Sequence, residues 1–86
     1  MFYVYILHSK KYSKSYVGIT DDVDRRLIEH NSKKSIYTSK YVPWDVIYSE
    51  SHVTRDDARK REKYLKSASG RRWMKINVKW PRGATE

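Results

Sequence analysis

The sequence predicts an α+β domain whose elements follow the order β-β-α-β-α-α. Three runs rich in β-branched and aromatic residues, at 2–7, 15–19 and 44–48, are typical of strands. Other stretches have apolar residues at every third or fourth position, which is typical of amphipathic helices. A chain of 86 residues buries only roughly 60% of its unfolded surface. We therefore expect a core formed by one layer of helices on a small sheet, or by an equivalent helical cluster.

The first two runs predict a hairpin. Residues 2–7 and 15–19 form its strands, and the polar, basic stretch 8–14 forms a long turn. The chain start lacks the basic segment and cleavage site of a secretory signal, and no apolar run approaches the roughly 18 residues that span a bilayer. A cytoplasmic protein without a membrane segment is expected. Because cysteine is absent, no disulfide partner is expected either.

A first helix is predicted to open at Thr20 or Asp21. Its inward face has apolar or aromatic members at helical spacing: Val23, Leu27 and His30. Residues 31–35 end this helix, and a basic loop containing tyrosines follows over residues 37–41. The third strand, at 44–48, then completes a passage of βαβ type.

A second helix is predicted to begin after Thr54, whose side chain can cap the backbone N–H of Asp57. It runs to about residue 67, and its inner stripe consists of Ala58, Arg61 or Glu62, and Leu65. A carboxylate on that stripe is unusual, because an unpaired buried charge costs several kcal/mol. Glu62 is therefore expected to meet a cation, which can be Arg61, a lysine or a metal ion.

The last predicted helix covers residues 71–77, with Trp73 and Ile76 facing inward. Residues 79–86 have no period, and we expect a frayed C-terminal tail there. The chain is thus expected to form one domain over residues 1–78, followed by this tail.

The charge points to a polyanionic partner. Nineteen Lys and Arg against ten Asp and Glu give a formal charge of +9, and aromatic residues make up 14% of the chain. A positive field of this kind most often meets nucleic acid. An acidic protein or a membrane surface would also respond to it, and a solvated basic face is the plainest alternative.

Several polar residues occupy positions where a core would favour carbon. They are Tyr5 and Tyr16 in the strands, Arg26 and His30 on the first helix, and Glu62 on the second. Nucleotide-binding loops of the GxxxxGK[ST] and GxGxxG types and the HExxH motif are absent from the sequence. Taken singly, the tyrosines read as half-buried packing residues, Arg26 as a solvated cation and His30 as a charge near a helix C-terminus.

Order and spacing give these residues a common meaning. Residues 3–5 (Tyr-Val-Tyr), residues 16–18 (Tyr-Val-Gly), Arg26, His30-Asn31, and Ala58 to Glu62 with Lys66 a turn later resemble the GIY-YIG endonuclease domain, over residues 2 to 67. The likeness is greatest to its small single-domain members. The resemblance implies a small three-stranded antiparallel sheet flanked by helices.

The resemblance also implies roles around a scissile phosphate. They fall on Tyr5, Tyr16, Arg26, His30 and Glu62 as catalytic residues. Glu62 would hold one Mg²⁺ or Mn²⁺, hard ions that take oxygen ligands, and Arg26 would bind phosphoryl oxygens. Tyr16 would be the general base, with His30 relaying or accepting its proton, and Tyr5 would orient water or phosphate. A phenol is a weak base at neutral pH, since its ordinary pKa is about 10, so this role needs Arg26 or the metal to favour phenolate.

Substrate binding is assigned to a basic and aromatic set: Tyr37, Lys33, Lys34, Lys40, Arg59 and Lys66. Contacts of this kind hold a nucleic acid without reading its sequence. The leading hypothesis is a metal-dependent DNA endonuclease, structure-guided or weakly specific, with a place in DNA repair or recombination. A catalytically silent nucleic-acid-binding module on the same fold is the alternative. A structural domain with an Arg61–Glu62 ion pair ranks third, and a monomer is the default state.

Overall fold

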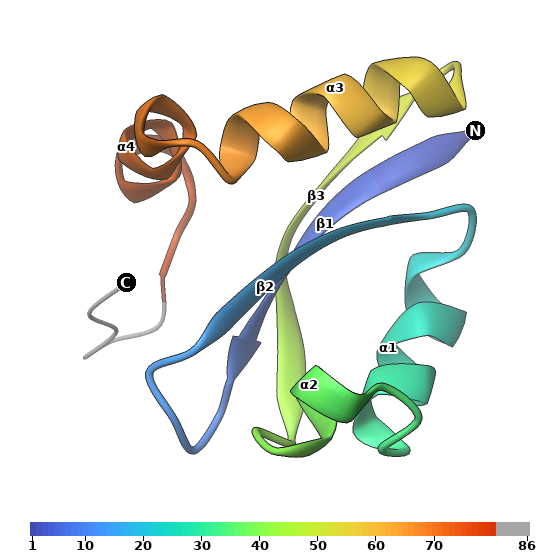
Figure 1. Ribbon diagram of the computed structural model, residues 1–86, viewed down its shortest axis with the longest axis vertical. Coiled ribbons are helices and arrows are strands. Elements are labelled where there is room, and N and C mark those ends of the chain that lie inside the picture. Colours follow the sequence, from blue (N-terminus) through green and yellow to red (C-terminus); the bar gives the residue numbers. More distant parts are fainter. Residues whose placement is uncertain (81–86) are drawn as a thin grey trace.

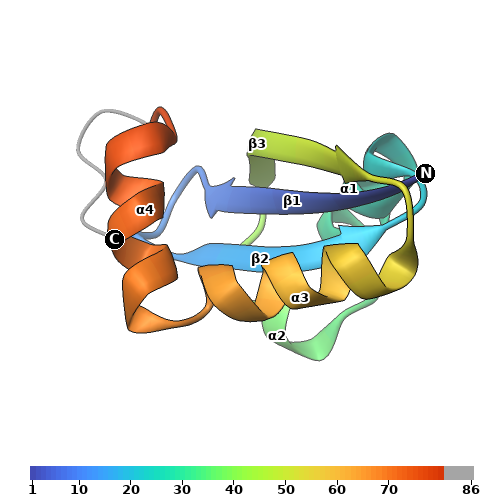
Figure 2. The same cartoon turned by 90° about the horizontal axis from the view of Figure 1, so that it is seen from above.

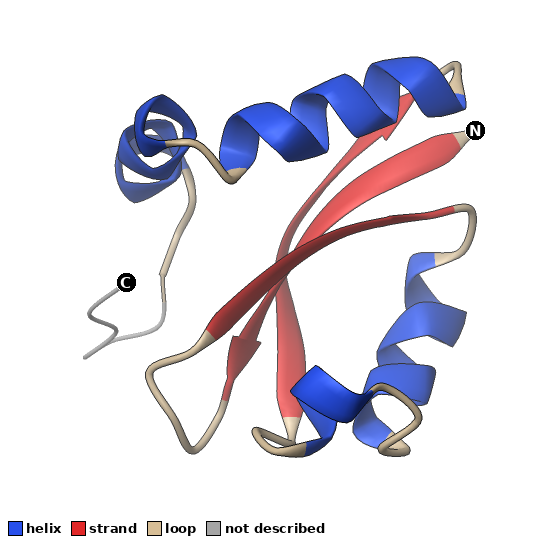
Figure 3. Ribbon diagram, in the orientation of Figure 1, coloured by secondary structure: helices blue, strands red, loops and turns tan. Residues whose placement is uncertain are grey.

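The computed structural model describes residues 1–80, and it contains a three-stranded antiparallel sheet with helices on both faces (Figure 1; Figure 3). The strands are β1 (Phe2–Ser9), β2 (Ser15–Thr20) and β3 (Trp44–His52), and the helices are α1 (Val23–Asn31), α2 (Ile36–Ser39), α3 (Arg55–Leu65) and α4 (Ala68–Asn77). The sheet order is β2-β1-β3, with β1 antiparallel to both neighbours. The predicted α+β class and antiparallel sheet are confirmed, and the short helix α2 is added where a loop was predicted.

The central strand β1 explains why the sheet is covered twice. Successive side chains of a strand point to opposite faces. Val4 and Ile6 pack toward α3 and α4, whereas Tyr5 and Leu7 pack toward α1 and the segment before β3. Figure 2 shows α3 running alongside β2, with α1 beyond the sheet. Because β1 is apolar on both faces, it needs two helical layers rather than the single layer that chain length suggested.

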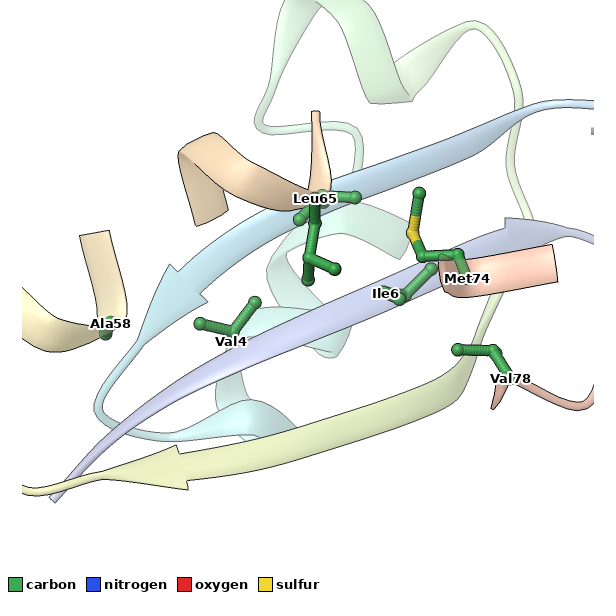
Figure 4. Close-up of a cluster of buried hydrophobic side chains, with 7 residues drawn as sticks. Val4, Ile6, Ala58, Leu65, Met74 and Val78 are labelled. Carbon is green, nitrogen blue, oxygen red and sulfur yellow. The ribbon is translucent and has the colours of Figure 1, made fainter. Parts of the chain in front are cut away.

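The core under α3 and α4 is aliphatic (Figure 4). It consists of Val4, Ile6, Val17, Ala58, Leu65, Met74 and Val78. The inward residue of α4 is Met74, whereas Ile76 is 82% exposed, so the prediction that Ile76 packs inward is wrong. The helix begins at Ala68, earlier than predicted, because the side chain of Ser67 caps the backbone N–H of Gly70. Met74 lies one turn after the buried Gly70 and so shares its face, as Ile76 does not.

The core on the other face closes around Trp44, which is 1% exposed. Its indole Nε1 donates to the carbonyl oxygen of Thr38 at 2.8 Å. The side chain of Asn31 brackets the backbone of Trp44, accepting from its N–H at 2.7 Å and donating to its carbonyl at 3.2 Å. These bonds hold α2 and the end of α1 against the first residue of β3, and they are not visible in local periodicity.

A polar cluster fixes α3 to β3. Arg61 Nε donates to Glu50 Oε2 at 3.0 Å, and Tyr48 Oη donates to Glu50 Oε1 at 2.6 Å. Although burial acts to raise it, the bonds from Tyr48, His52 and Arg61 hold the pKa of Glu50 below its usual value. The suggested Arg61–Glu62 ion pair is therefore wrong, since Arg61 is engaged across the interface. The Thr54 cap is confirmed, with its side chain accepting from the Asp57 N–H at 3.1 Å.

Ordered packing continues past α4. Val78 is buried, and Trp80 Nε1 donates to the carbonyl oxygen of Met74 at 3.1 Å. The expected frayed tail began at residue 79; within it Trp80 packs against the aliphatic core, and residues 81–86 lie outside the described residues. Within residues 1–80, no helix is long and apolar enough to cross a membrane.

Candidate active site

A glycine in β2 allows two tyrosine rings to meet over the sheet. Tyr5 and Gly18 are direct partners in the β1–β2 ladder, and Tyr16 precedes Gly18 by two residues and so shares its face. A Cβ atom on Gly18 would lie 2.7 Å from Tyr5 Oη and 2.9 Å from Tyr16 Cε2. Any other residue would therefore displace a ring. The two phenols lie with their ring centroids 6.2 Å apart.

His30 lies beneath these rings with both nitrogens engaged. Its Nε2 is 2.9 Å from Tyr5 Oη, and its Nδ1 is 2.9 Å from Thr38 Oγ1. His30 and Thr38 have no exposed surface, and Tyr5 is 1% exposed. Burial lowers the pKa of His30, and the charge of Arg26 acts in the same direction. Burial, with a further contribution from Tyr16, raises the pKa of Tyr5 to about 12. A neutral imidazole thus meets a protonated phenol.

Arg26 faces the same phenol from α1. Its guanidinium donates to Glu29 Oε1 at 2.8 Å, and 32% of its side chain is exposed. The hydrogen bond with Glu29 raises the pKa of Arg26. Burial dominates and raises the pKa of Tyr5, and the charge of Arg26 partly offsets that rise. The tautomer of His30 decides which atom donates in its bonds to Tyr5 Oη and Thr38 Oγ1.

Tyr16 occupies the more exposed side of this cluster. Its ring centroid is 5.0 Å from that of His30 and 6.4 Å from that of Tyr37, a half-exposed residue of α2. The hydrogen bonds of His30 run to Tyr5 and Thr38, not to Tyr16 as the predicted relay requires. The reason is depth, because Tyr5 lies directly over Gly18 and reaches the buried imidazole first.

Glu62 approaches the cluster from the opposite helical layer. It lies on α3, its side chain is 21% exposed, and its Oε2 accepts from Lys66 Nζ at 2.9 Å. A lysine is thus the cation that the half-buried carboxylate meets. The charge of Glu62 is among the influences that raise the pKa of Tyr5, so the carboxylate lies within electrostatic range of the phenol.

The donor set can be compared with what a divalent ion needs. Residues 1–80 contain no group of three or more His, Cys, Asp or Glu side chains that could hold a metal. Mg²⁺ and Mn²⁺ accept a single protein carboxylate when waters and a substrate phosphate complete the shell. Glu62, partly exposed and salt-bridged to Lys66 at the surface, fits such an ion, bound together with its substrate rather than in a cage.

The predicted substrate-binding cations are all exposed, but they lie in two places. Lys33 and Lys34 follow α1, and Lys40 follows α2. Arg59 and Lys66 lie three residues before and four residues after Glu62, on the same side of α3. Only the second group lies beside the carboxylate.

Sequence reasoning missed Thr38 and the structural roles of Asn31 and Gly18. Thr38, which holds His30, lies in a stretch without helical or strand periodicity, so nothing local marks it. Asn31 was noted for its place after His30, but its bonds to Trp44 join segments 13 residues apart. Gly18 carried a usable signal, because an isolated glycine within a strand often marks a close approach.

Comparison with known proteins identifies this arrangement. The model of the GIY-YIG catalytic domain matches residues 1–77. The chain belongs to the GIY-YIG family. Its relatives include a UPF0213 protein of Staphylococcus saprophyticus, 33% identical over 75 residues that cover 86% of this chain and 90% of the relative. Another is a UPF0213 protein of Haloquadratum walsbyi, 39% identical over 66 residues, 76% of this chain and 73% of the relative.

A solved structure supports the same assignment. The solution NMR structure of the UPF0213 protein BH0048 from Bacillus halodurans has a TM-score of 0.52 and 33% sequence identity, covering 88% of this chain and 82% of that chain. The chain therefore carries a nuclease-type GIY-YIG domain, a class that generally uses divalent metal ions. The two tyrosines predicted from the family motifs, Tyr5 and Tyr16, lie on β1 and β2.

Proposed function

We propose that this GIY-YIG protein is a divalent-metal-dependent endonuclease that hydrolyses phosphodiester bonds of DNA, guided by substrate structure or by weak sequence preference. The observation that carries the proposal is the convergence of a partly exposed arginine, a phenol and a carboxylate around Tyr5. Arg26, Tyr16 and Glu62 all act on the pKa of that buried phenol. A role in DNA repair or recombination stays a prediction.

Arg26 is the phosphate-binding group. Glu29 engages one end of its guanidinium, which leaves the remaining N–H groups of a partly exposed fork for phosphoryl oxygens. Charge-assisted bonds of this kind strengthen as negative charge accumulates on the phosphate in the transition state.

Tyr16, as its phenolate, would orient the attacking water and take its proton, which it later releases to solvent, because its ring borders the cluster while His30 is already engaged by Tyr5. The water oxygen bonds to phosphorus, the ester P–O bond breaks, and the leaving oxygen takes a proton from solvent. Glu62 would hold Mg²⁺ or Mn²⁺, which supplies charge neutralisation at the phosphate and a more acidic water. Tyr5 and His30 are positioning residues, because both are buried.

The test is a gel assay of the purified protein on supercoiled, single-stranded and branched DNA with EDTA, Mg²⁺ or Mn²⁺. Glu62→Gln should abolish cleavage and leave DNA affinity nearly unchanged. Asp56→Asn, which removes one exposed carboxylate from the same helix, is the matched control and should cut normally. A Glu62→Gln protein that still cuts at the normal rate would refute the role given to Glu62.

One observation favours the catalytically silent binding module as a second candidate. Lys66 already neutralises Glu62 at 2.9 Å, and the described residues offer no further carboxylate cluster for a metal. This candidate expects binding without cleavage on every substrate and with either ion. It also expects affinity to fall steeply with salt, since roughly six phosphate contacts give a log–log slope near −5.

A further inference from the structure

A second feature adjoins Tyr16. It is a surface hollow of about 580 Å³ lined by residues from the start of β2, α2, the end of α3 and α4; Figure 1 shows where these elements lie. We call it the α4 hollow. Its volume falls within the roughly 300–1,000 Å³ that small-molecule sites occupy. Its base is apolar, formed by Val17, Leu65 and Met74.

The charged groups that line the α4 hollow are all cations. They are Lys66, Arg71 and Lys75, and the lining includes no Asp or Glu. Arg71 and Lys75 are one turn apart on α4, where like charges repel and weaken a helix. Neither forms a salt bridge with any residue in 1–80, whereas Lys66 joins the hollow to Glu62. Two uncompensated cations facing one cavity favour an anionic occupant.

Aromatic rings border the same hollow. Tyr16 and Tyr37 contribute from β2 and α2, and Trp80 contributes from the segment after α4. The indole of Trp80 is held in place by its bond to the Met74 carbonyl and by edge contact with the ring of His8. Tyr37 is 46% exposed, so part of its ring is open to a partner. Flat rings beside cations match a nucleobase and its phosphate, respectively.

We propose that the α4 hollow binds one unpaired nucleotide next to the scissile phosphate. Its base would enter between the aromatic rings, and its phosphate would meet Arg71 and Lys75. A base inside a continuous duplex is stacked and paired, so it cannot reach such a hollow without leaving the helix. The inference rests on the proposed nuclease function and names its substrate class: DNA with an unpaired nucleotide at the cleavage point, such as a flap or a bulge.

The test measures binding, with EDTA present so that no cleavage occurs. The probe is a short duplex with a single bulged 2-aminopurine, compared with the same duplex in which 2-aminopurine is paired. The full chain should bind the bulged probe roughly five to ten times more tightly, in keeping with stacking of one base. Its 2-aminopurine fluorescence should fall on binding.

Two variants separate the hollow from general attraction of DNA. The double variant Arg71→Ala/Lys75→Ala should lose the preference for the bulged probe. Lys60→Ala/Arg72→Ala removes two exposed cations from α3 and α4 outside the hollow, and it should keep the preference even if overall affinity falls. Trp80→Ala should remove the fluorescence change. Because Trp80 also packs on the core, the two charge variants decide the matter if Trp80→Ala does not fold.

The outcomes also separate this inference from the proposed activity. An equal affinity of the wild-type protein for both probes, or a preference that survives Arg71→Ala/Lys75→Ala, would overturn the α4 hollow as a nucleotide site, even if the protein cleaves DNA. A preference lost only in the hollow variant would support the site, even if no substrate is cut with Mg²⁺ or Mn²⁺, in which case the nuclease proposal fails by itself.

Discussion

Gly18→Ala should cost more stability than its single methyl group suggests. The new Cβ would lie 2.7 Å from Tyr5 Oη and 2.8 Å from Tyr5 Cζ. Tyr5 is 1% exposed and packed between Tyr16 and His30, so the ring has little room to move. Overpacking of this kind costs about 1–3 kcal/mol. Displacing the phenol from His30 leaves buried polar groups unpaired, at about 1–3 kcal/mol more.

A small opposing effect comes from the unfolded chain, because replacing glycine by alanine reduces its entropy by about 0.4–1 kcal/mol. The net loss is therefore about 1–5 kcal/mol. For a domain of this size each kcal/mol lowers Tm by about 4–8 °C, so a fall of at least about 4 °C is expected. The fall would be measured by urea and thermal unfolding followed by circular dichroism.

Ser49→Ala provides the matched control. Ser49 is the partner of Tyr5 on the other side, in β3, and it is exposed. Its replacement should change stability by less than about 0.5 kcal/mol. If Gly18→Ala were equally mild and still cleaved DNA normally, the close approach of Tyr5 to Gly18 would not be what organises the site.

Three further predictions concern titration and packing. Burial raises the pKa of Tyr5 to about 12, so a pH titration followed by absorbance at 295 nm should show one tyrosine ionising near pH 12, and Tyr5→Phe should remove that transition. The free energy of unfolding should fall as pH rises from 10 to 12, because the phenol of the unfolded chain loses its proton first. Burial lowers the pKa of His30, so the unfolded state binds a proton first and the free energy of unfolding should fall as pH drops below about 6.5. In urea unfolding, His30→Gln should show a weaker pH dependence than the wild-type protein, and an equally strong dependence would contradict the argument. Gly70→Ala should be harsher than Gly18→Ala, with a Tm fall on thermal unfolding of at least about 8 °C, because its Cβ would meet backbone atoms of Tyr64 and Leu65, which cannot rotate away; a change in Tm below about 2 °C would contradict this packing.

The sequence alone was sufficient for the elements whose side chains follow a simple period. The β-branched and aromatic runs of β1 and β2, the Thr54 cap and the inward Ala58 and Leu65 of α3 are local patterns, and the structure confirms them. The resemblance drawn from Tyr5, Tyr16 and their spacing also led to the correct family. Local patterns are readable because strand and helix geometry fix which neighbours share a face.

Other features were decided only when distant segments met. The helix α2 carries no periodic signal and depends on Trp44, whose indole bonds to Thr38. Met74 turns inward in place of Ile76 because the cap at Ser67 sets the start of α4. Glu62 pairs with Lys66 rather than with Arg61, because Arg61 is already bonded to Glu50, 11 residues before it in the chain.

The same division holds for the site. The sequence alone identifies the residue types suited to phosphodiester chemistry, because the functional group that each residue carries does not depend on the fold. It could not assign their hydrogen bonds, since these depend on depth. The buried Tyr5 takes His30, which leaves Tyr16 at the border of the α4 hollow. Which tyrosine meets the imidazole and which borders the α4 hollow is therefore determined by the tertiary structure, through the close approach that Gly18 permits.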